Sequence, residues 1–281
     1  MKAIIYNFLY IRLERSLLCL IINLRNFLKK INIKIKYIDN NYLVYDEQNK
    51  LFTKNKHRFK RLINMGFKQR SSQLAKIYML DKVPFIDGDN VVDVGADMGE
   101  IFFYFKFIEK NIKYWTFEPT NSHFLLKKNF PNSIHFNIAL FKKDGNKIFF
   151  SKENTGDSSL IEMKNFTKKN TIEVKTLKFL DKYFTKIKLL KIDAEGAEPE
   201  VLINLNKINV KIEYISVDTG HERGIRKLNT QKRCYIILKN NNYEKISTFN
   251  DGIRIVDLYK KRSNSTLVDN KGYRSRVRVA V

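Results

Sequence analysis

The residues with the clearest chemistry form a glycine turn at 91–99, Val-Val-Asp-Val-Gly-Ala-Asp-Met-Gly. The apolar residues before Gly95 predict a buried strand, and the apolar run after Gly99 predicts the helix that follows. Gly95 lets the backbone come close to a ligand, and the N–H groups at the helix start can hold a carboxylate or a phosphate. The G-x-G-x-x-G spacing of a dinucleotide site does not occur here, so the turn favours a different ligand.

A second acidic position lies 25 residues after Asp93, where Trp115-Thr116-Phe117 is followed by Glu118. An acid about 20 residues beyond a glycine turn lies at the tip of the adjacent strand and can accept both ribose hydroxyls of a nucleoside. Capping of the next helix is the alternative role for Glu118, but it does not explain the spacing. The D-x-G-x-x-x-G form of the turn is typical of S-adenosylmethionine sites, because an acidic strand end suits an ammonium and a sulfonium group.

Three carboxylates cluster in 191–198, Lys-Ile-Asp-Ala-Glu-Gly-Ala-Glu, where a buried strand becomes a helix. Ligands of open α/β sheets bind outside the carboxyl ends of the strands, so these side chains are expected at the same edge as the glycine turn. Asp193 and Glu195 could hold the cofactor, a substrate or a divalent cation such as Mg²⁺, with Asp218 as a further candidate ligand. Glu198 has the simpler alternative of favouring the helix N-terminus.

The loop 218–224, Asp-Thr-Gly-His-Glu-Arg-Gly, also follows a strand directly. Its aspartate, histidine and arginine could provide a base, an orienting group and an anion clamp. Loop histidines are more often exposed and inert, and this alternative remains open for His221.

An alternation of strands and helices positions these four segments and predicts an α/β fold with a parallel sheet and helices on both faces. A short turn at 250–252 separates the last two strands and predicts that they are antiparallel neighbours. A polar insertion at 141–175 contains strand-like runs at 147–150 and 171–174. The strands are predicted at about 90–94, 113–117, 133–138, 187–193, 210–217, 243–248 and 253–259, and the helices at about 98–110, 120–129, 196–206 and 229–240.

The net charge of +24 resides mainly at the two ends of the chain. Residues 1–80 contain 17 Lys/Arg and 4 Asp/Glu, and residues 260–281 contain 7 and 1, which leaves a net charge of only +5 for 81–259. Two interpretations remain open. The ends bind phosphate of an anionic lipid or of nucleic acid, or they reflect the Lys-, Asn- and Ile-rich composition of the whole chain.

Dense apolar residues from Ala3 to Leu28 predict a basic amphipathic helix that lies on a membrane surface, through residues 1–30, packs on a partner, or packs on its own domain. Its longest uninterrupted apolar run, Leu17 to Ile22, is far shorter than the roughly 20 residues of a membrane span. Two distant cysteines and an apolar stretch broken by charges predict a cytoplasmic protein, at the inner face of a membrane if this helix binds lipid. The predicted apolar face consists of Ile4, Phe8, Ile11, Leu18 and Ile22.

Taken in order, these motifs resemble the FkbM-type methyltransferases, a family of S-adenosylmethionine-dependent enzymes in the class I methyltransferase superfamily. The resemblance runs from about residue 58 to residue 259, and its most telling part is the Lys-Ile-Asp-x-Glu-Gly-x-Glu segment at 191–198. The other matching segments are Asp93-Val94-Gly95-Ala96 with Gly99, Phe117-Glu118-Pro119, Ala139-Leu140 with Gly145, Ser158-Ser159-Leu160 and Thr176-Leu177.

The resemblance implies a Rossmann-like sheet of seven strands whose last strand is antiparallel. It implies methyl transfer, usually to a hydroxyl of a sugar or polyketide, so a hydroxyl-bearing small molecule or a glycan is the expected acceptor. The organisation that follows is a basic amphipathic N-terminal extension at 1–57, a methyltransferase domain at 58–260 and a basic flexible tail at 261–281.

The resemblance also implies roles for single residues. Glu118 is expected to bind the ribose of the cofactor, and Asp193 and Glu195 to face the transfer site. Position 97 departs from the family, because it is aspartate where asparagine is common, and the loop 218–224 does not match the simplest family pattern. The implied cofactor-binding residues are Asp93, Gly95, Ala96, Gly99, Glu118 and Ala139, with Asp93, Gly95 and Gly99 against the methionine part.

Methyl transfer to an alcohol needs a base or a metal to remove the proton. Asp193, Glu195 and His221 are the candidates for this role, with or without a bound Mg²⁺. The alternative function is a methyltransferase-like fold without catalysis that binds an anionic surface, membrane or nucleic acid, through its basic ends. A nucleic-acid substrate is not expected, because the Asn/Asp-Pro-Pro-Tyr/Phe motif of base amino methylation does not occur in the sequence.

Overall fold

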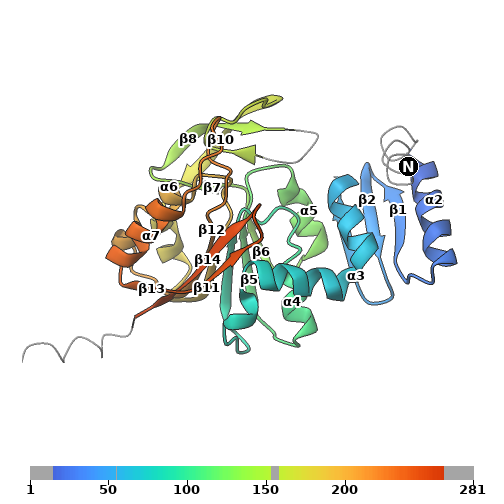
Figure 1. Ribbon diagram of the computed structural model, residues 1–281, viewed down its shortest axis with the longest axis horizontal. Helices are drawn as coiled ribbons and strands as arrows, with labels where there is room; N and C mark the ends of the chain where they lie inside the picture. The colour runs from blue at the N-terminus through green and yellow to red at the C-terminus, as the bar shows by residue number, and fades with distance from the viewer. Residues whose placement is uncertain (1–14, 55, 153–157, 263–281) are drawn as a thin grey trace, which may run out of the picture.

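The computed structural model describes residues 15–54, 56–152 and 158–262, and a seven-stranded sheet forms its centre (Figure 1). Strand β14 is antiparallel to both of its neighbours, and the other six strands run in one direction. The predicted α/β fold with seven strands and an antiparallel last strand is therefore confirmed. In spatial order the strands are β13 (Tyr243–Asn250), β14 (Ile255–Lys261), β12 (Lys211–Asp218), β11 (Lys186–Ile192), β4 (Asn90–Val94), β5 (Lys113–Phe117) and β6 (Ile134–Phe136).

Apolar cores cover both faces of this sheet. Leu189 and Leu190 are adjacent on β11 and point to opposite faces, yet both are fully buried. Leu190 belongs to a core with Val201 and Leu238, whereas Leu189 belongs to a core with Phe105. Burial on both faces explains why the strands are continuous apolar runs in the sequence. The helices after these strands are α4 (Phe102–Phe107), α5 (Ser122–Asn129), α6 (Glu198–Leu202) and α7 (Gln231–Asn240).

Two of these helices are shorter than predicted. Helix α4 begins three residues after Gly99, and Glu109, with a left-handed φ of 54°, follows its C-terminal end. Helix α6 begins with Glu198 and Pro199 and gives way to a 3-10 helix at Leu205–Lys207. The residues that precede both helices form the turns that line the site described below.

The insertion after β6 forms a second, small sheet with the order β7 (Ala139–Leu140), β10 (Lys168–Lys175), β8 (Gly145–Ser151) and β9 (Ser158–Ser159). Strands β8 and β10 are antiparallel and contain the two strand-like runs predicted at 147–150 and 171–174. The hydroxyl of Ser159 donates to the backbone carbonyl of Glu195 at 2.7 Å. The small sheet is thereby held over the carboxyl end of β11.

The N-terminal part of the described chain contains a helix, a three-stranded antiparallel sheet and a long helix, in which Gly66 (φ 77°, ψ 166°) forms a kink. Its core continues into the central domain, where it includes Met98 and Phe130. Leu18 and Ile22 of the predicted apolar face are buried in this core, so the described part of that face packs on the chain itself. Ile4, Phe8 and Ile11 lie outside the described residues. The elements are α2 (Arg15–Leu28), β1 (Lys34–Ile38), β2 (Asn41–Tyr45), β3 (Lys50–Thr53) and α3 (Lys56–Ile77).

Within the part of the chain that the structure describes, no helix has the length and apolar character needed to cross a bilayer. Strand β14 ends at Lys261, and the backbone N–H of Arg262 donates to the carbonyl of Asn242 at 2.9 Å. The rest of the predicted tail, 263–281, lies outside the described residues.

Candidate active site

A cavity of about 750 Å³ opens at the carboxyl ends of β4, β5 and β11. This volume falls within the range of about 300–1,000 Å³ that is usual for small-molecule sites. The glycine turn and the loop after β5 form one wall, the end of β11 and the end of α3 form another, and β8 and β10 contribute residues from the small sheet. The residues predicted from sequence that line it are Asp93, Gly95, Ala96, Glu118, Ala139, Asp193 and Glu195.

Gly95 is required by the close approach of two strands. Its φ is 73°, and a Cβ at this position would lie 1.8 Å from the backbone oxygen of Asp193. The N–H of Gly95 donates to Phe117 at 2.9 Å, and the N–H of Asp193 donates to Val94 at 3.0 Å, so both neighbouring strands hold the turn. Contact with the backbone of β11, more than the expected approach of a ligand, thus explains this glycine.

Gly99 does not line the cavity, although the family resemblance implied a contact with the methionine part of the cofactor. A Cβ on Gly99 would lie 2.6 Å from the ring of Phe130 and 2.9 Å from the side chain of Leu126. The glycine therefore allows the turn to pack on α5. Its place in the motif reflects packing within the protein, whereas Ala96, three residues earlier, lies in the cavity wall.

Asp93 is 1% exposed and forms part of a buried network beneath the turn. Its Oδ1 lies 2.9 Å from the Nζ of Lys191, and its Oδ2 accepts a hydrogen bond from the hydroxyl of Tyr114 at 2.5 Å. Burial alone would lower the pKa of Lys191, but the charges of Asp93 and Asp193 and the hydrogen bond to Asp93 together outweigh burial and raise that pKa. Lys191 also donates to the carbonyl of Gly95 at 2.9 Å. Asp93 therefore stabilises the turn through Lys191.

Glu118 is 5% exposed at the end of β5 and accepts hydrogen bonds from two backbone N–H groups, those of Asp97 and Thr120, each at 2.9 Å. Burial and the nearby Asp97 carboxylate raise the pKa of Glu118 above its ordinary value. Asp97 has a left-handed φ of 48°, a conformation in which Asn and Asp are both enriched. The departure from the family's asparagine is thus compatible with this backbone.

Asp193 is joined to two residues that the sequence motifs did not indicate, Tyr78 and Arg254. The hydroxyl of Tyr78 donates to Oδ2 of Asp193 at 2.6 Å, and Nη1 of Arg254 donates to the same hydroxyl at 2.7 Å. Burial and the charge of Asp193 raise the pKa of Tyr78, so the phenol keeps its proton and acts as a donor. All three residues line the cavity. Tyr78 lies 115 residues before Asp193, which is why no local pattern connects them.

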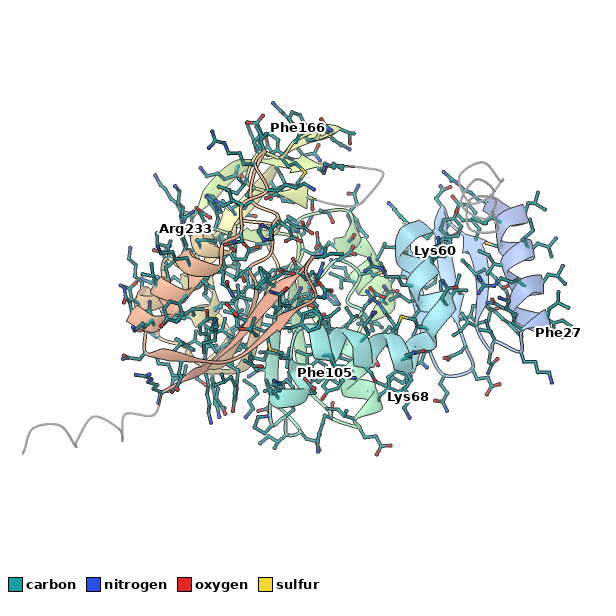
Figure 2. The ribbon with its side chains drawn as sticks, in the orientation of Figure 1. Phe27, Lys60, Lys68, Phe105, Phe166 and Arg233 are labelled. Carbon is teal, nitrogen blue, oxygen red and sulfur yellow. The ribbon has the colours of Figure 1, made fainter. Side chains whose placement is uncertain are left out.

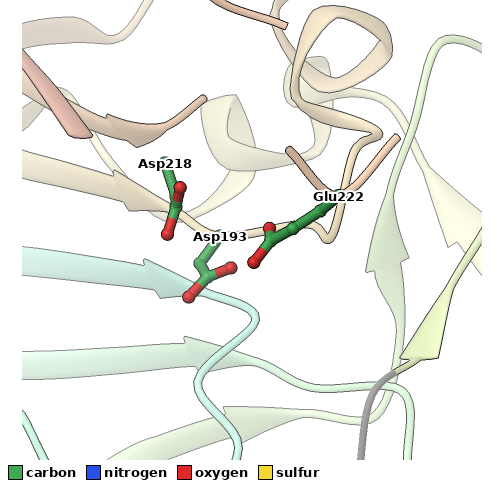
Figure 3. Close-up of side chains that lie close together, drawn as sticks. All are labelled: Asp193, Asp218 and Glu222. Atoms are coloured by element: carbon green, nitrogen blue, oxygen red, sulfur yellow. The ribbon is translucent and has the colours of Figure 1, made fainter. Parts of the chain in front are cut away.

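Two more carboxylates, Asp218 and Glu222, converge on Asp193 (Figure 3), and one oxygen of each of the three groups lies within 4.8 Å of the other two. Burial and the charge of Asp193 raise the pKa of Asp218, and burial followed by the charge of Glu195 raises that of Glu222. Nη1 of Arg254 lies 3.5 Å from Asp193 and 3.2 Å from Asp218. Arg254 is therefore a positive partner of this cluster.

The predicted metal set of Asp193, Glu195 and Asp218 is not the set that the fold assembles. Among the described residues, Asp193 and Asp218 are grouped with Glu222, and Glu195 is not part of the group. Glu195 has a left-handed φ of 49° and lines the cavity, and its charge acts on Glu222 from outside the group. Because a guanidinium already lies against two of the three carboxylates, the donor set fits an ion-pair network better than a Mg²⁺ site.

His221 is exposed and is not among the residues that line the cavity. Arg223, two residues after His221, pairs with Glu200 at 2.7 Å and donates to the carbonyl of Gly196 at 2.6 Å. The loop 218–224 thus uses its arginine to hold the start of α6, and it brings Glu222 in place of His221 to Asp193.

Glu198 holds the segment between β11 and α6 in place. It is 1% exposed, and its Oε1 accepts hydrogen bonds from the N–H groups of Ala194 and Gly196 at 3.1 and 2.9 Å. Its Oε2 accepts a hydrogen bond from the hydroxyl of Thr230 at 3.0 Å. Burial raises the pKa of Glu198 to about 7. This carboxylate therefore orders the backbone that carries Asp193 and Glu195, a larger role than favouring a helix N-terminus.

Glu198→Gln is expected to change how stability depends on pH. A carboxyl whose pKa is higher in the folded than in the unfolded chain stabilises the fold below the unfolded pKa and loses that contribution as pH rises through the folded pKa. For a pKa shift from 4.5 to about 7, the free energy of unfolding falls by about 3 kcal/mol as pH rises from 4.5 to somewhat above 7. Urea unfolding at pH 5 to 8 should show a smaller loss of stability for Glu198→Gln than for wild type. The exposed Glu109→Gln serves as control, and an identical slope for Glu198→Gln and wild type would contradict this assignment.

The strand order, the antiparallel β14 and the cavity at the strand ends define a Rossmann-like methyltransferase of class I. The family model of the methyltransferase FkbM domain matches residues 93–245, more than half of the chain. The chain belongs to this family of S-adenosylmethionine-dependent methyltransferases.

Matching solved structures include a TehB-like SAM-dependent methyltransferase from Corynebacterium glutamicum, with 13% identity over 73% of this chain and 95% of that chain and a TM-score of 0.41. The fibrillarin pre-rRNA processing protein of Methanococcus jannaschii has 12% identity over 82% and 97%, with a TM-score of 0.45. TrmK of M. capricolum, solved with S-adenosyl-homocysteine, has 13% identity over 68% and 67%, with a TM-score of 0.40. None of the curated proteins matches the chain in sequence.

Proposed function

We propose that the protein transfers a methyl group from S-adenosylmethionine to a hydroxyl oxygen of a sugar, a glycan or another hydroxyl-bearing metabolite. The observation that carries the proposal is the composition of one cavity, in which Asp193 lies together with the glycine turn and Glu118. Membership of the FkbM family supports methyl transfer as the reaction. A carboxylate that can accept a proton thus shares a cavity with the proposed cofactor site.

The residues of the cavity fit S-adenosylmethionine. Glu118 lies at the end of β5, where a carboxylate can accept ribose hydroxyls, and together with Asp97 it gives this wall negative charge that suits an ammonium and a sulfonium group. Gly95 and Ala96 present no bulky side chain to the same wall. When bound, the cofactor supplies an electrophilic methyl carbon, and the binding, orientation and deprotonation of the acceptor fall to the chain.

Asp193 is the base in this proposal. An alcohol is a poor nucleophile at neutral pH, and a carboxylate within hydrogen-bond reach can take its proton. The hydrogen bond from Tyr78 and the guanidinium of Arg254 fix the orientation of Asp193 at the end of a buried strand. Such fixed placement matters because the acceptor oxygen must lie in line with the methyl carbon and its leaving group. Glu195, on the same wall, is assigned to acceptor binding.

Glu118→Ala is expected to weaken the binding of S-adenosylhomocysteine by about 100-fold, because hydrogen bonds to a charged group contribute about 1.5–3 kcal/mol each. Calorimetry measures this effect directly. Glu118→Gln keeps an acceptor oxygen and should lose less affinity, and the melting temperature of each variant shows whether the loop around Asp97 and Thr120 remains folded. If the wild-type protein released no heat with S-adenosylhomocysteine, the non-catalytic alternative would be favoured.

The acceptor class is tested with labelled S-adenosylmethionine and glycans and lipids extracted from the source organism. Transfer to a hydroxyl yields a methyl ether, which survives mild alkali, whereas a methyl ester is hydrolysed. Label retained on a carbohydrate fraction after mild alkali supports the proposal. Label confined to an alkali-labile ester or to an amine would overturn the O-methylation assignment and leave the cofactor assignment intact.

A further inference from the structure

The outer face of α2 carries a stripe of exposed apolar side chains. Their positions follow i, i+3, i+4, i+7, i+10 and i+11, which at about 100° per residue places them within about 120° of arc on one helix face. Phe27, the most exposed, points away from the sheet at the outer side of α2 (Figure 2). The stripe, called the α2 stripe below, consists of Leu17 (44% exposed), Leu20 (64%), Ile21 (37%), Leu24 (58%), Phe27 (80%) and Leu28 (72%).

The packing of α2 fixes this face outward. The side-chain amide of Asn23 donates to the carbonyl of Ile35 at 2.9 Å and accepts from the N–H of Ile35 at 2.8 Å, which ties the helix along the edge strand β1. Asn26 donates to the carbonyl of Ile33 at 2.7 Å. Rotation of α2 to hide the stripe would break these bonds and expose the buried side of the helix. That side consists of Leu18, Cys19, Ile22 and Asn26.

The charged side chains of α2, of β1 and of the segment between them are all basic. Residues 15–36 contain six Lys/Arg and no Asp/Glu. Lys29 and Lys30, directly after α2, and Lys34 and Lys36 on β1 are exposed. An exposed apolar helix face with basic side chains around it suits an anionic bilayer, where acyl chains receive the apolar groups and headgroups receive the cations.

The length of α2 determines how such a contact is made. Its 14 residues span roughly 21 Å, less than the roughly 30 Å of a hydrocarbon core, so the helix would lie in the interface plane and not cross the bilayer. We propose that the α2 stripe is a docking surface for an anionic lipid bilayer. The basis is the α2 stripe and its charge, so this inference is independent of the proposed methyl transfer.

Sedimentation of the full chain with vesicles tests the proposal. Vesicles of phosphatidylcholine and phosphatidylglycerol in equal parts should bind the protein, and phosphatidylcholine vesicles should bind it less, because the basic residues lose their lipid partners. The double variant Leu24→Ser, Phe27→Ser should bind the mixed vesicles about tenfold or more weakly, since two side chains no longer enter the acyl boundary. The matched control is Ile203→Ser, Ile236→Ser, which changes two side chains that are 50% and 47% exposed elsewhere on the surface.

Three results would overturn the proposal. The first is equal vesicle binding by wild type and the Leu24→Ser, Phe27→Ser variant, with melting temperatures that show both to be folded. The second is a dimer in gel filtration that this variant abolishes, which would assign the stripe to a second copy of the chain. The third concerns the Phe27→Trp variant, in which the emission of the new tryptophan is obtained by subtracting the wild-type spectrum. If this emission is blue-shifted before any vesicle is added, the stripe is already covered by protein. A blue shift only on addition of mixed vesicles supports docking.

Discussion

Asp193→Asn is expected to lower the rate of methyl transfer by about 10²–10⁴-fold, the usual contribution of a general base, while the affinity for S-adenosylhomocysteine changes little. Asparagine preserves the shape of the side chain and an oxygen that can accept the hydrogen bond from Tyr78, but it cannot take a proton at neutral pH. The loss should therefore appear in turnover and not in cofactor binding. Single-turnover transfer from labelled S-adenosylmethionine, with calorimetry on the same preparation, separates the two quantities.

Two comparisons make this result specific. Tyr78→Phe removes the donor that orients Asp193 and should reduce turnover by less than Asp193→Asn, with a shift in the pH profile of transfer, because Tyr78 is a positioning residue. His221→Asn should leave turnover unchanged, because His221 is exposed and lies outside the cavity lining. Turnover of Asp193→Asn close to that of wild type would remove Asp193 from the role of base, whatever the result for cofactor binding.

Gly95→Ala should abolish the native fold or destabilise it by about 4–5 kcal/mol, at the upper end of what single substitutions do. The left-handed φ of 73° costs a residue with a Cβ about 1–2 kcal/mol. The larger part arises because that Cβ would lie 1.8 Å from the backbone oxygen of Asp193, so that β4 and β11 must separate. Urea unfolding of the purified variant, or its recovery in the soluble fraction, measures the effect.

Gly88→Ala is the matched control for the conformational cost alone. Gly88 has a φ of 82°, and a Cβ there would meet no atom within 4 Å. Its expected cost is therefore only about 1–2 kcal/mol. If the two alanine variants lost equal stability, steric contact with β11 could not be the reason for glycine at position 95.

Strand positions were predictable to within a few residues because strands buried on both faces are continuous apolar runs bounded by turn residues. The β13–β14 hairpin was also predicted correctly, since only a short turn, residues 251–254, separates the two strands. Two helices at strand ends were predicted too long, in part because the residues directly after Gly99 and those at 193–197 form turns before the helices begin. Local apolar spacing does not distinguish such a turn from a first helical turn.

Site residues were predictable where they belong to a short motif at the end of a strand. Asp193, Glu118 and the glycine turn were found because the carboxyl ends of parallel strands meet at one edge of the sheet. Tyr78 and Arg254 were not found, because they lie directly after α3 and in the turn before β14 and meet Asp193 only in the folded chain. Their residue types are common in loops and helix ends, and no spacing relates them to the motif.

The sequence by itself determined the α/β class, the order of the strand-end motifs and the resemblance to the FkbM family, because hydrophobic periodicity and short spacings are local properties of the chain. Only the tertiary structure decided which polar groups meet. It turned Glu222 rather than His221 toward Asp193, paired Asp93 with Lys191, and buried one face of α2 while leaving the other exposed. The physical reason is that hydrogen bonds, ion pairs and the burial of a helix face depend on distances between segments that are remote in sequence.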